Sequence, residues 1–228
     1  MIGFLTTLLE NAPGWLERLR PALFMTLAVT AASFVAASLL AIGLELARQS
    51  RTKAARWAAR ACIDFVRCVP ILAILYLLYF GLPGIGIAFS SFVAGTIGLA
   101  LVYSTYIAEV LRGGVSAIHR GQREAAIAAG LTPLMTFRYI VLPQALRVMA
   151  APLLVTFISL LKDSSICALI AVNELMLTSK VIMSETFMPL HVFVLVGAIY
   201  FAVAWPMSLL ARWIERRLAR ASRSAAIP

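Results

Sequence analysis

The sequence predicts an all-α membrane protein of about five transmembrane helices, with a cytoplasmic helix-turn-helix between the third and fourth spans. Of its 228 residues, 62% are hydrophobic and 13% are charged, and the mean hydropathy is +0.93. A soluble domain of this length could not cover that much apolar side chain with residues that water tolerates. The apolar residues also gather in long stretches, with lysine and arginine in blocks between them. We therefore treat residues 1–228 as a single transmembrane domain.

Several apolar stretches of the chain approach or exceed the roughly 20 residues that a helix needs to cross a bilayer. The candidate spans cover residues 22–47, 63–82, 89–111, 146–161 and 190–210. The fourth is short, and the apolar run that follows it, residues 166–172, cannot cross alone. We expect that run to be re-entrant or packed within the protein, and residues 173–189 to lie at the membrane interface. A sixth span in this region is the main alternative.

The placement of lysine and arginine predicts the orientation, because loops rich in these residues stay in the cytoplasm. They crowd the first connection, the third connection and the segment after the last span. The second connection, residues 81–88, carries no charge, and the fourth holds only Lys162 and Lys180 against Asp163, Glu174 and Glu185. The N-terminus is therefore expected outside and the C-terminus in the cytoplasm. The net charge of +10 follows from this topology, so we expect membrane lipid and no nucleic acid as a partner.

The polar insert between the third and fourth spans, residues 112–147, is predicted to form two short helices. Residues 122–129 are rich in helix formers, and Gly130 can adopt the left-handed conformation that ends a helix. Thr132 is suited to cap the second helix, with Pro133 at its first position. Pro143 is expected to interrupt the chain just before the fourth span.

The residue types of the insert suit contact with a moving partner. Small side chains at Ala125 and Ala126 would permit close approach of a partner helix. Glu124 supplies one charge for an ion pair with a basic partner, which would fix the register. The same local residues fit equally well an ordinary cytoplasmic hairpin in which alanine merely favours helix.

Several short segments follow one another in a set order along the chain from about residue 26. They are Tyr79-Phe-Gly-Leu-Pro, Tyr106-Ile-Ala-Glu-Val-Leu-Arg-Gly-Gly, Gly121-Gln-Arg-Glu-Ala-Ala, Ile140-Val-Leu-Pro-Gln-Ala-Leu-Arg, Phe157-Ile-Ser-Leu-Leu-Lys-Asp, Glu174-Leu and Glu215-Arg-Arg-Leu. In their order and spacing the chain resembles the permeases of polar amino acid importers of the ATP-binding-cassette (ABC) class, of the histidine, glutamine and arginine type. The insert looks like their EAA loop.

This resemblance implies a permease subunit of an ABC importer for an amino acid or related small polar solute, in the bacterial cytoplasmic (inner) membrane. It implies a dimer with an identical or homologous permease, ATPase subunits docked at the insert, and an extracytoplasmic solute-binding protein. ATP and Mg would bind the ATPase, and this non-catalytic chain, which lacks a Gly-x4-Gly-Lys-Ser/Thr loop, would bind no cofactor. The implied ATPase-coupling residues are Gly121, Glu124, Ala125, Ala126, Gly130, Leu142 and Pro143.

Polar groups at membrane depth are candidates for the solute path, because such groups are usually paired or functional. Lys162 and Asp163 interrupt an apolar run, and they suit either the two charges of an amino acid or a pair with each other. For Glu109, a local pair with Arg112 three residues on is favoured over a solute contact, and Asp64 with Arg67 and Glu45 with Arg48 are interpreted in the same way. The candidate path comprises Tyr103, Ser104, Glu109, Ser159, Lys162, Asp163 and Ser164.

The chain departs from the family pattern in the expected path. Val102 and Val155 stand where related permeases typically have Asn, which removes two amides. Arg67-Cys-Val-Pro replaces the usual Arg-Gly-Thr-Pro. One explanation is the non-binding half of a heterodimeric permease, and another is an unusual solute such as an opine or a compatible solute.

Two other functional classes are weighed against the importer. An ion-coupled secondary transporter or channel working without an ATPase is the alternative, although we find no internal repeat of the kind that such folds often contain. A membrane enzyme would need paired carboxylates, a metal set or an activated nucleophile in one cavity. The cysteines and histidines have no metal-like spacing: Cys62, Cys68, Cys167, His119 and His191. We therefore expect no catalytic site and no metal site.

Overall fold

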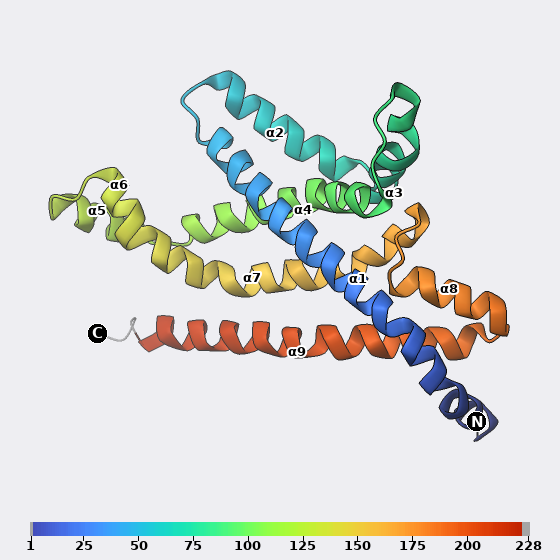
Figure 1. Ribbon diagram of the computed structural model, residues 1–228. Helices are drawn as coiled ribbons and strands as arrows, with labels where there is room; N and C mark the ends of the chain where they lie inside the picture. Colours follow the sequence, from blue (N-terminus) through green and yellow to red (C-terminus); the bar gives the residue numbers. More distant parts are fainter. Residues whose placement is uncertain (1, 225–228) are drawn as a thin grey trace.

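The computed structural model describes residues 2–224, with side chains for residues 3–218, and its regular elements there are all helical. The predicted domain thus includes residues 1 and 225–228, which lie outside the described residues. The main helices are α1 (Ile2–Arg48), α2 (Lys53–Cys68), α3 (Ile71–Tyr76), α4 (Ser91–Ser116), α5 (Arg120–Ala128), α6 (Pro133–Met135), α7 (Leu142–Asp163), α8 (Leu175–Thr186) and α9 (Pro189–Ser224). Figure 1 shows their arrangement.

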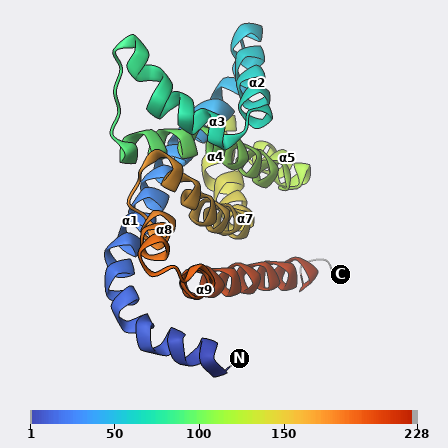
Figure 2. The same ribbon diagram turned by 90° about the vertical axis from the view of Figure 1, so that its right-hand side faces the viewer.

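Helix α4 forms the centre of the packing: α1 crosses it on one side and α7 on the other, while α9 packs against α7 (Figures 1 and 2). The main core cluster includes Leu99, Tyr103 and Ile107 of α4 and Leu160 of α7. A glycine in α4 makes room for side chains of the neighbouring segment. A Cβ on Gly98 would lie 2.6 Å from Cδ2 of Leu75, so the side chain of Leu75 occupies the space that a larger residue would fill.

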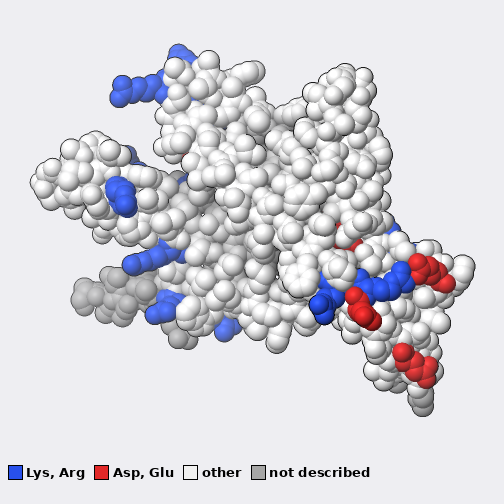
Figure 3. Space-filling view, viewed as in Figure 1, with Lys and Arg blue, Asp and Glu red and all other residues white. Residues whose placement is uncertain are grey.

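Four helical segments of the structure match four of the five spans predicted from the sequence. Among the described residues, α1, α4, the helical segment Pro133–Ile170 and α9 are each long and apolar enough to cross a bilayer. Helices α2 and α3 add a fifth only if the two are counted as one broken span. In Figure 3, Lys and Arg gather mostly toward the end that carries the insert, and the visible Asp and Glu lie mostly at the opposite end. This polarity accords with the predicted orientation, which stays a prediction.

The second predicted span, residues 63–82, is wrong as a single helix. Helix α2 ends at Cys68 and α3 begins at Ile71, and the two are bent by 100°. Pro70 has no N–H, and its ring disfavours the helical conformation in the preceding residue. Val69 accordingly has extended backbone angles, φ −93° and ψ 129°. A break therefore lies in the middle of a stretch that apolar length alone predicted to be continuous.

The segment after the fourth span is packed within the protein, as predicted. Residues Ser164–Ile170 form a 3-10 helix, and Cys167, Ile170 and Val172 lie in the main core cluster. Helix α8, Leu175–Thr186, has 12 residues and is therefore about 18 Å long, well short of the roughly 30 Å hydrocarbon layer. The alternative of a sixth span is therefore wrong for this segment.

Candidate functional site

The polar insert folds as α5, a tight turn and α6. Gly130 ends α5 with a left-handed φ of +84°, and its N–H donates to the carbonyl of Ile127 at 2.9 Å. Thr132 caps α6, because its hydroxyl accepts a hydrogen bond from the N–H of Met135 at 3.3 Å. Both local predictions are confirmed, so the chemistry of two residues sets the shape of the turn.

Pro143 does not interrupt the chain, and that prediction is wrong. Helix α6, a π-helical turn at Thr136–Val141 and α7 follow one another directly, with Pro143 in the first turn of α7. A proline ring inside a helix normally clashes with the preceding turn, and the wider π-helical turn gives it room. The second half of the insert is therefore the beginning of the helix that continues through the fourth span.

The insert is attached to the helix bundle along its inner side. Arg123 of α5 donates through Nη2 to the carbonyl of Val115 near the end of α4, at 2.8 Å. Ala126 is only 7% exposed, so this alanine packs within the chain and is not available to a partner helix. A cluster of buried side chains joins α7 to the end of α4: Ile118, Val141, Ala145 and Met149. Movement of the insert would therefore be transmitted to α4 and α7.

The outer side of the insert is exposed and largely apolar. Glu124 and Ala125 are exposed, and Glu124 makes no ion pair within the described part of the chain. Large apolar side chains are exposed as well, with Leu134 at 76%, Tyr139 at 63% and Ile127 at 56%. We group Glu124 and Ala125 with the large exposed apolar side chains and call this group the exposed insert surface: Glu124, Ala125, Ile127, Leu134, Met135, Phe137 and Tyr139. Of the other predicted coupling residues, Pro143 is exposed, while Gly121 and Leu142 are partly buried.

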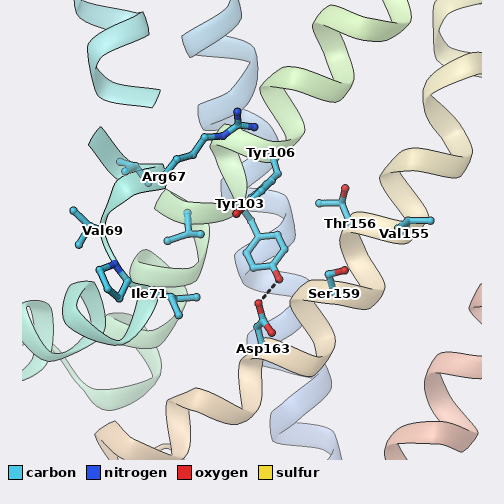
Figure 4. Close-up of a pocket in the computed structure, with 12 residues that line it drawn as sticks. Arg67, Val69, Ile71, Tyr103, Tyr106, Val155, Thr156, Ser159 and Asp163 are labelled. Carbon is cyan, nitrogen blue, oxygen red and sulfur yellow. Dashed lines mark hydrogen bonds between the residues drawn. The ribbon is translucent and has the colours of Figure 1, made fainter. Parts of the chain in front are cut away.

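A cavity of about 510 Å³ lies where the break between α2 and α3 meets α4 and α7 (Figure 4). The Tyr103 hydroxyl of α4 donates to Oδ2 of Asp163, at the end of α7, at 2.7 Å. On the α2 side, Arg67 donates through Nη2 to the carbonyl of Thr105 at 3.4 Å, and its guanidinium carbon lies 5.2 Å from the ring centre of Tyr106. The lining residues are Val66, Arg67, Val69, Pro70, Ile71, Val102, Tyr103, Tyr106, Val155, Thr156, Ser159 and Asp163. We call this the solute cavity, after the predicted solute path with which it is compared below.

The structure brings three residues of the predicted path together in the solute cavity: Tyr103, Ser159 and Asp163. Ser104 and Ser164 are buried, and their hydroxyls donate to carbonyls of the preceding turn, those of Leu101 and Leu161. Lys162 is exposed and does not line the cavity. The structure therefore does not bring Ser104, Ser164 or Lys162 into the cavity.

Glu109 lies in a cluster of ion pairs apart from the cavity. Its carboxylate pairs with Arg112, as the local spacing predicted, and also accepts a hydrogen bond from Arg48 of α1 at 2.7 Å. Arg48 is also 3.7 Å from the carboxylate of Glu45, which confirms that pair. The cluster joins the ends of α1 and α4 near the insert, which is a structural role.

Sequence reading missed the contribution of α2 to the cavity. The predicted pair of Asp64 with Arg67 is wrong, because Arg67 is directed instead to the backbone and to Tyr106 of α4. The sequence did contain a signal for this contribution, namely an arginine three residues before a proline within a predicted span. The proline breaks the helix, and a broken helix end within a membrane is found where it lines a cavity or is buried in protein. Val102 and Val155, the two departures from the family pattern, both line the cavity.

The cavity combines one cationic group, one carboxylate, two phenols and two hydroxyls with valine and isoleucine walls. Mixed walls of this kind suit a small solute that carries both charged and apolar parts. Among the described residues, no group of three or more His, Cys, Asp or Glu side chains is placed to hold a metal ion.

Comparison with known proteins places the chain among transport proteins. Residues 35–220 match the family described as binding-protein-dependent transport system inner membrane component. The chain is 38% identical to the probable amino-acid ABC transporter permease YckA of Bacillus subtilis, covering 85% of this chain and 86% of that one. It is 32% identical to the probable glutamine ABC transporter permease GlnM of the same organism, covering 92% and 96%.

Two solved structures share the fold. A chain from the crystal structure of an amino acid ABC transporter with histidines aligns with a TM-score of 0.84 at 32% identity, covering 94% of this chain and 98% of that one. A chain from the inward-facing MetNI methionine ABC transporter aligns with a TM-score of 0.69 at 20% identity, covering 86% and 96%. At that lower identity the second likeness shows the fold alone.

Proposed function

Because the chain belongs to the family of binding-protein-dependent transport system inner membrane components, as an amino acid permease of an ABC importer, we propose how its two sites work together. The exposed insert surface docks a separate ATPase subunit, which holds ATP and Mg. The solute cavity belongs to the path of an amino acid or related solute, delivered by an extracytoplasmic binding protein. A second permease, identical or homologous, completes that path.

One observation carries the proposal: the insert and the solute cavity share a continuous helical segment. The insert residues Leu134 and Tyr139 lie on the segment Pro133–Ile170, and so do the cavity residues Ser159 and Asp163. Exposed apolar side chains on a polar segment favour contact with a partner protein. Movement of a docked ATPase would therefore act on the cavity through one continuous helical segment.

The expected switch is a shift between two packed arrangements of the helices. ATP binding to the partner would favour one arrangement only if the docked ATPase makes different contacts in the two states. Helix shifts at subunit interfaces are a common form of such transitions. The cluster that joins α7 to the end of α4, with Val141 and Met149 buried in it, would carry the movement to α4 and α7, two of the helices that line the cavity.

The cavity offers opposite charges to an amino acid. Arg67 presents a guanidinium from the α2 side, which suits the solute carboxylate. Asp163 presents a carboxylate from the α7 side, which suits the ammonium group of the solute. The Tyr103 hydroxyl donates a hydrogen bond to the Asp163 carboxylate and so helps to hold it in place. Val102 and Val155 supply an apolar wall in place of the amides of related permeases, so the solute side chain would be held by contact and not by hydrogen bonds.

The experiment that tests this function measures uptake by the chain in membranes with its ATPase and binding protein. The labelled panel spans basic, acidic and amide amino acids, opines and compatible solutes. We expect ATP-dependent uptake of one member, and a loss of at least tenfold in Glu124→Lys, because reversing a charge at a docking surface places like charges together at a cost of several kcal/mol.

Glu10→Lys is the matched control, because it makes the same charge reversal at an exposed α1 residue outside the insert. Its uptake should stay within about twofold of the parent chain, as exposed surface charges contribute little on their own. Uptake that continues without ATP, or that survives Glu124→Lys, would overturn the coupling and favour a transporter working alone.

A further inference from the structure

A second cavity, of about 450 Å³, lies between α7 and α9 and takes no part in the proposed transport path. Its lining comes from two helices that lie side by side in Figures 1 and 2. Helix α7 contributes Arg147 and Ala150, and α9 contributes Trp213, Ile214, Arg217 and Leu218. None of these residues lines the solute cavity. We call it the α7–α9 cavity.

Two arginines, one from each helix, give the α7–α9 cavity an uncompensated positive charge. Arg147 and Arg217 are both exposed, and neither makes an ion pair with any residue whose side chain the structure describes. No acidic side chain lies among the described lining residues. The guanidinium carbon of Arg217 lies 5.2 Å from the ring centre of Trp213, so the ring helps to hold it. Such a site suits an anion, above all a phosphate, which arginine binds through two parallel donors.

The position of the cavity along the helices points to the edge of the membrane. Arg147 lies at the start of the fourth predicted span, residues 146–161. Arg217 follows the end of the last predicted span by seven residues, or about 10 Å of helix. The headgroup region adds roughly 5 to 8 Å to each side of the hydrocarbon layer. The backbone of Arg217 therefore lies just beyond it, and the long arginine side chain can extend back to the headgroups. Trp213 is of the residue type favoured at this boundary.

We propose that the α7–α9 cavity binds an anionic phospholipid, with its headgroup phosphate on Arg147 and Arg217 and its apolar part against Trp213, Ala150 and Ile214. Basic pockets between membrane helices on the cytoplasmic side are a known way of recognising anionic headgroups. A lipid fits better than an acidic segment of a partner protein, because the cavity has an apolar wall as well as two cations. It also lies beside the predicted ends of the fourth and last spans, where lipid headgroups are expected.

Binding is tested on the whole transporter, purified with its ATPase and partner permease. Labelled phosphatidylglycerol and labelled phosphatidylcholine are titrated separately, and the amount bound per chain is measured. For the double variant R147Q/R217Q, we expect phosphatidylglycerol to bind roughly 10- to 30-fold more weakly, since each basic residue near the surface contributes about fivefold. The charge-retaining variant R147K/R217K should stay within about threefold of the parent transporter.

The matched control is R51Q/R60Q, which removes two exposed arginines outside the cavity and leaves phosphatidylglycerol binding nearly unchanged. Any one of four results would overturn the proposal. The control and R147Q/R217Q could weaken binding equally, which would mean general surface charge. Phosphatidylcholine could bind as tightly, or inorganic phosphate could displace the lipid at millimolar concentration, which would mean a site without lipid selectivity. Finally, R147Q/R217Q could release the ATPase or the second permease with lipid binding unchanged, which would make the cavity a protein contact.

Discussion

Replacing Gly130 by proline is expected to abolish ATP-driven uptake while the chain still reaches the membrane in nearly normal amounts. Gly130 has φ +84° and donates its N–H to Ile127, whereas proline fixes φ near −65° and has no N–H to donate. Proline also disfavours the conformation of Ala129, whose ψ is 7°. The turn would reorient α5 relative to the helix that begins at Pro133. Uptake and the amount of chain in the membrane are the two measurements.

Gly86→Pro is the control for this result, because Gly86 has the same geometry at another turn. Its φ is also +84°, and its N–H donates to the carbonyl of Pro83 at 3.0 Å. The local strain is therefore similar, but the turn lies outside the insert. We expect Gly86→Pro to retain at least half of the parent uptake. Equal loss of uptake in the two variants would mean that general destabilisation, and not coupling, explains the effect of Gly130→Pro.

Replacing Asp163 by asparagine is expected to raise the solute concentration for half-maximal uptake by about 10- to 100-fold. Asparagine keeps an oxygen that can accept from Tyr103, so the local geometry is largely preserved. It removes the negative charge that we assign to the solute ammonium group, and hydrogen bonds to charged groups contribute about 1.5 to 3 kcal/mol. Uptake measured over a range of solute concentrations checks the result.

Lys162→Gln is the matched control, since it removes a charge from the neighbouring residue, which is exposed and outside the solute cavity. Its half-maximal concentration should change by less than about threefold. Both variants should still bind the ATPase, because neither lies on the exposed insert surface. Normal uptake by Asp163→Asn, or an equal effect of Lys162→Gln, would remove Asp163 from the solute path.

The sequence is informative wherever a structural feature depends on a few neighbouring residues. The Gly130 turn and the Thr132 cap follow from local backbone preferences, and both are present. The pairs of Glu109 with Arg112 and Glu45 with Arg48 follow from helical spacing, and both form. The approximate spans follow from apolar length, except where Pro70 breaks the second one.

The features that sequence reading missed depend on packing between distant segments. Ala126 is buried and Ile127 is exposed, a division set by how α5 packs on the bundle and not by residue type. Arg67 reaches the solute cavity because the bend at Pro70 brings the end of α2 to α4. Pro143 is accommodated by a π-helical turn that no local pattern in the sequence predicted.

The most direct test of the coupling is photocrosslinking from the exposed insert surface. A photoreactive amino acid is placed at Leu134, which is 76% exposed, or at Ile85, which is 72% exposed but lies outside the insert. In membranes that contain the assembled transporter, we predict a crosslinked product with the ATPase from position 134 and none from position 85. No product from position 134, or equal products from both positions, would contradict docking of the ATPase at the insert.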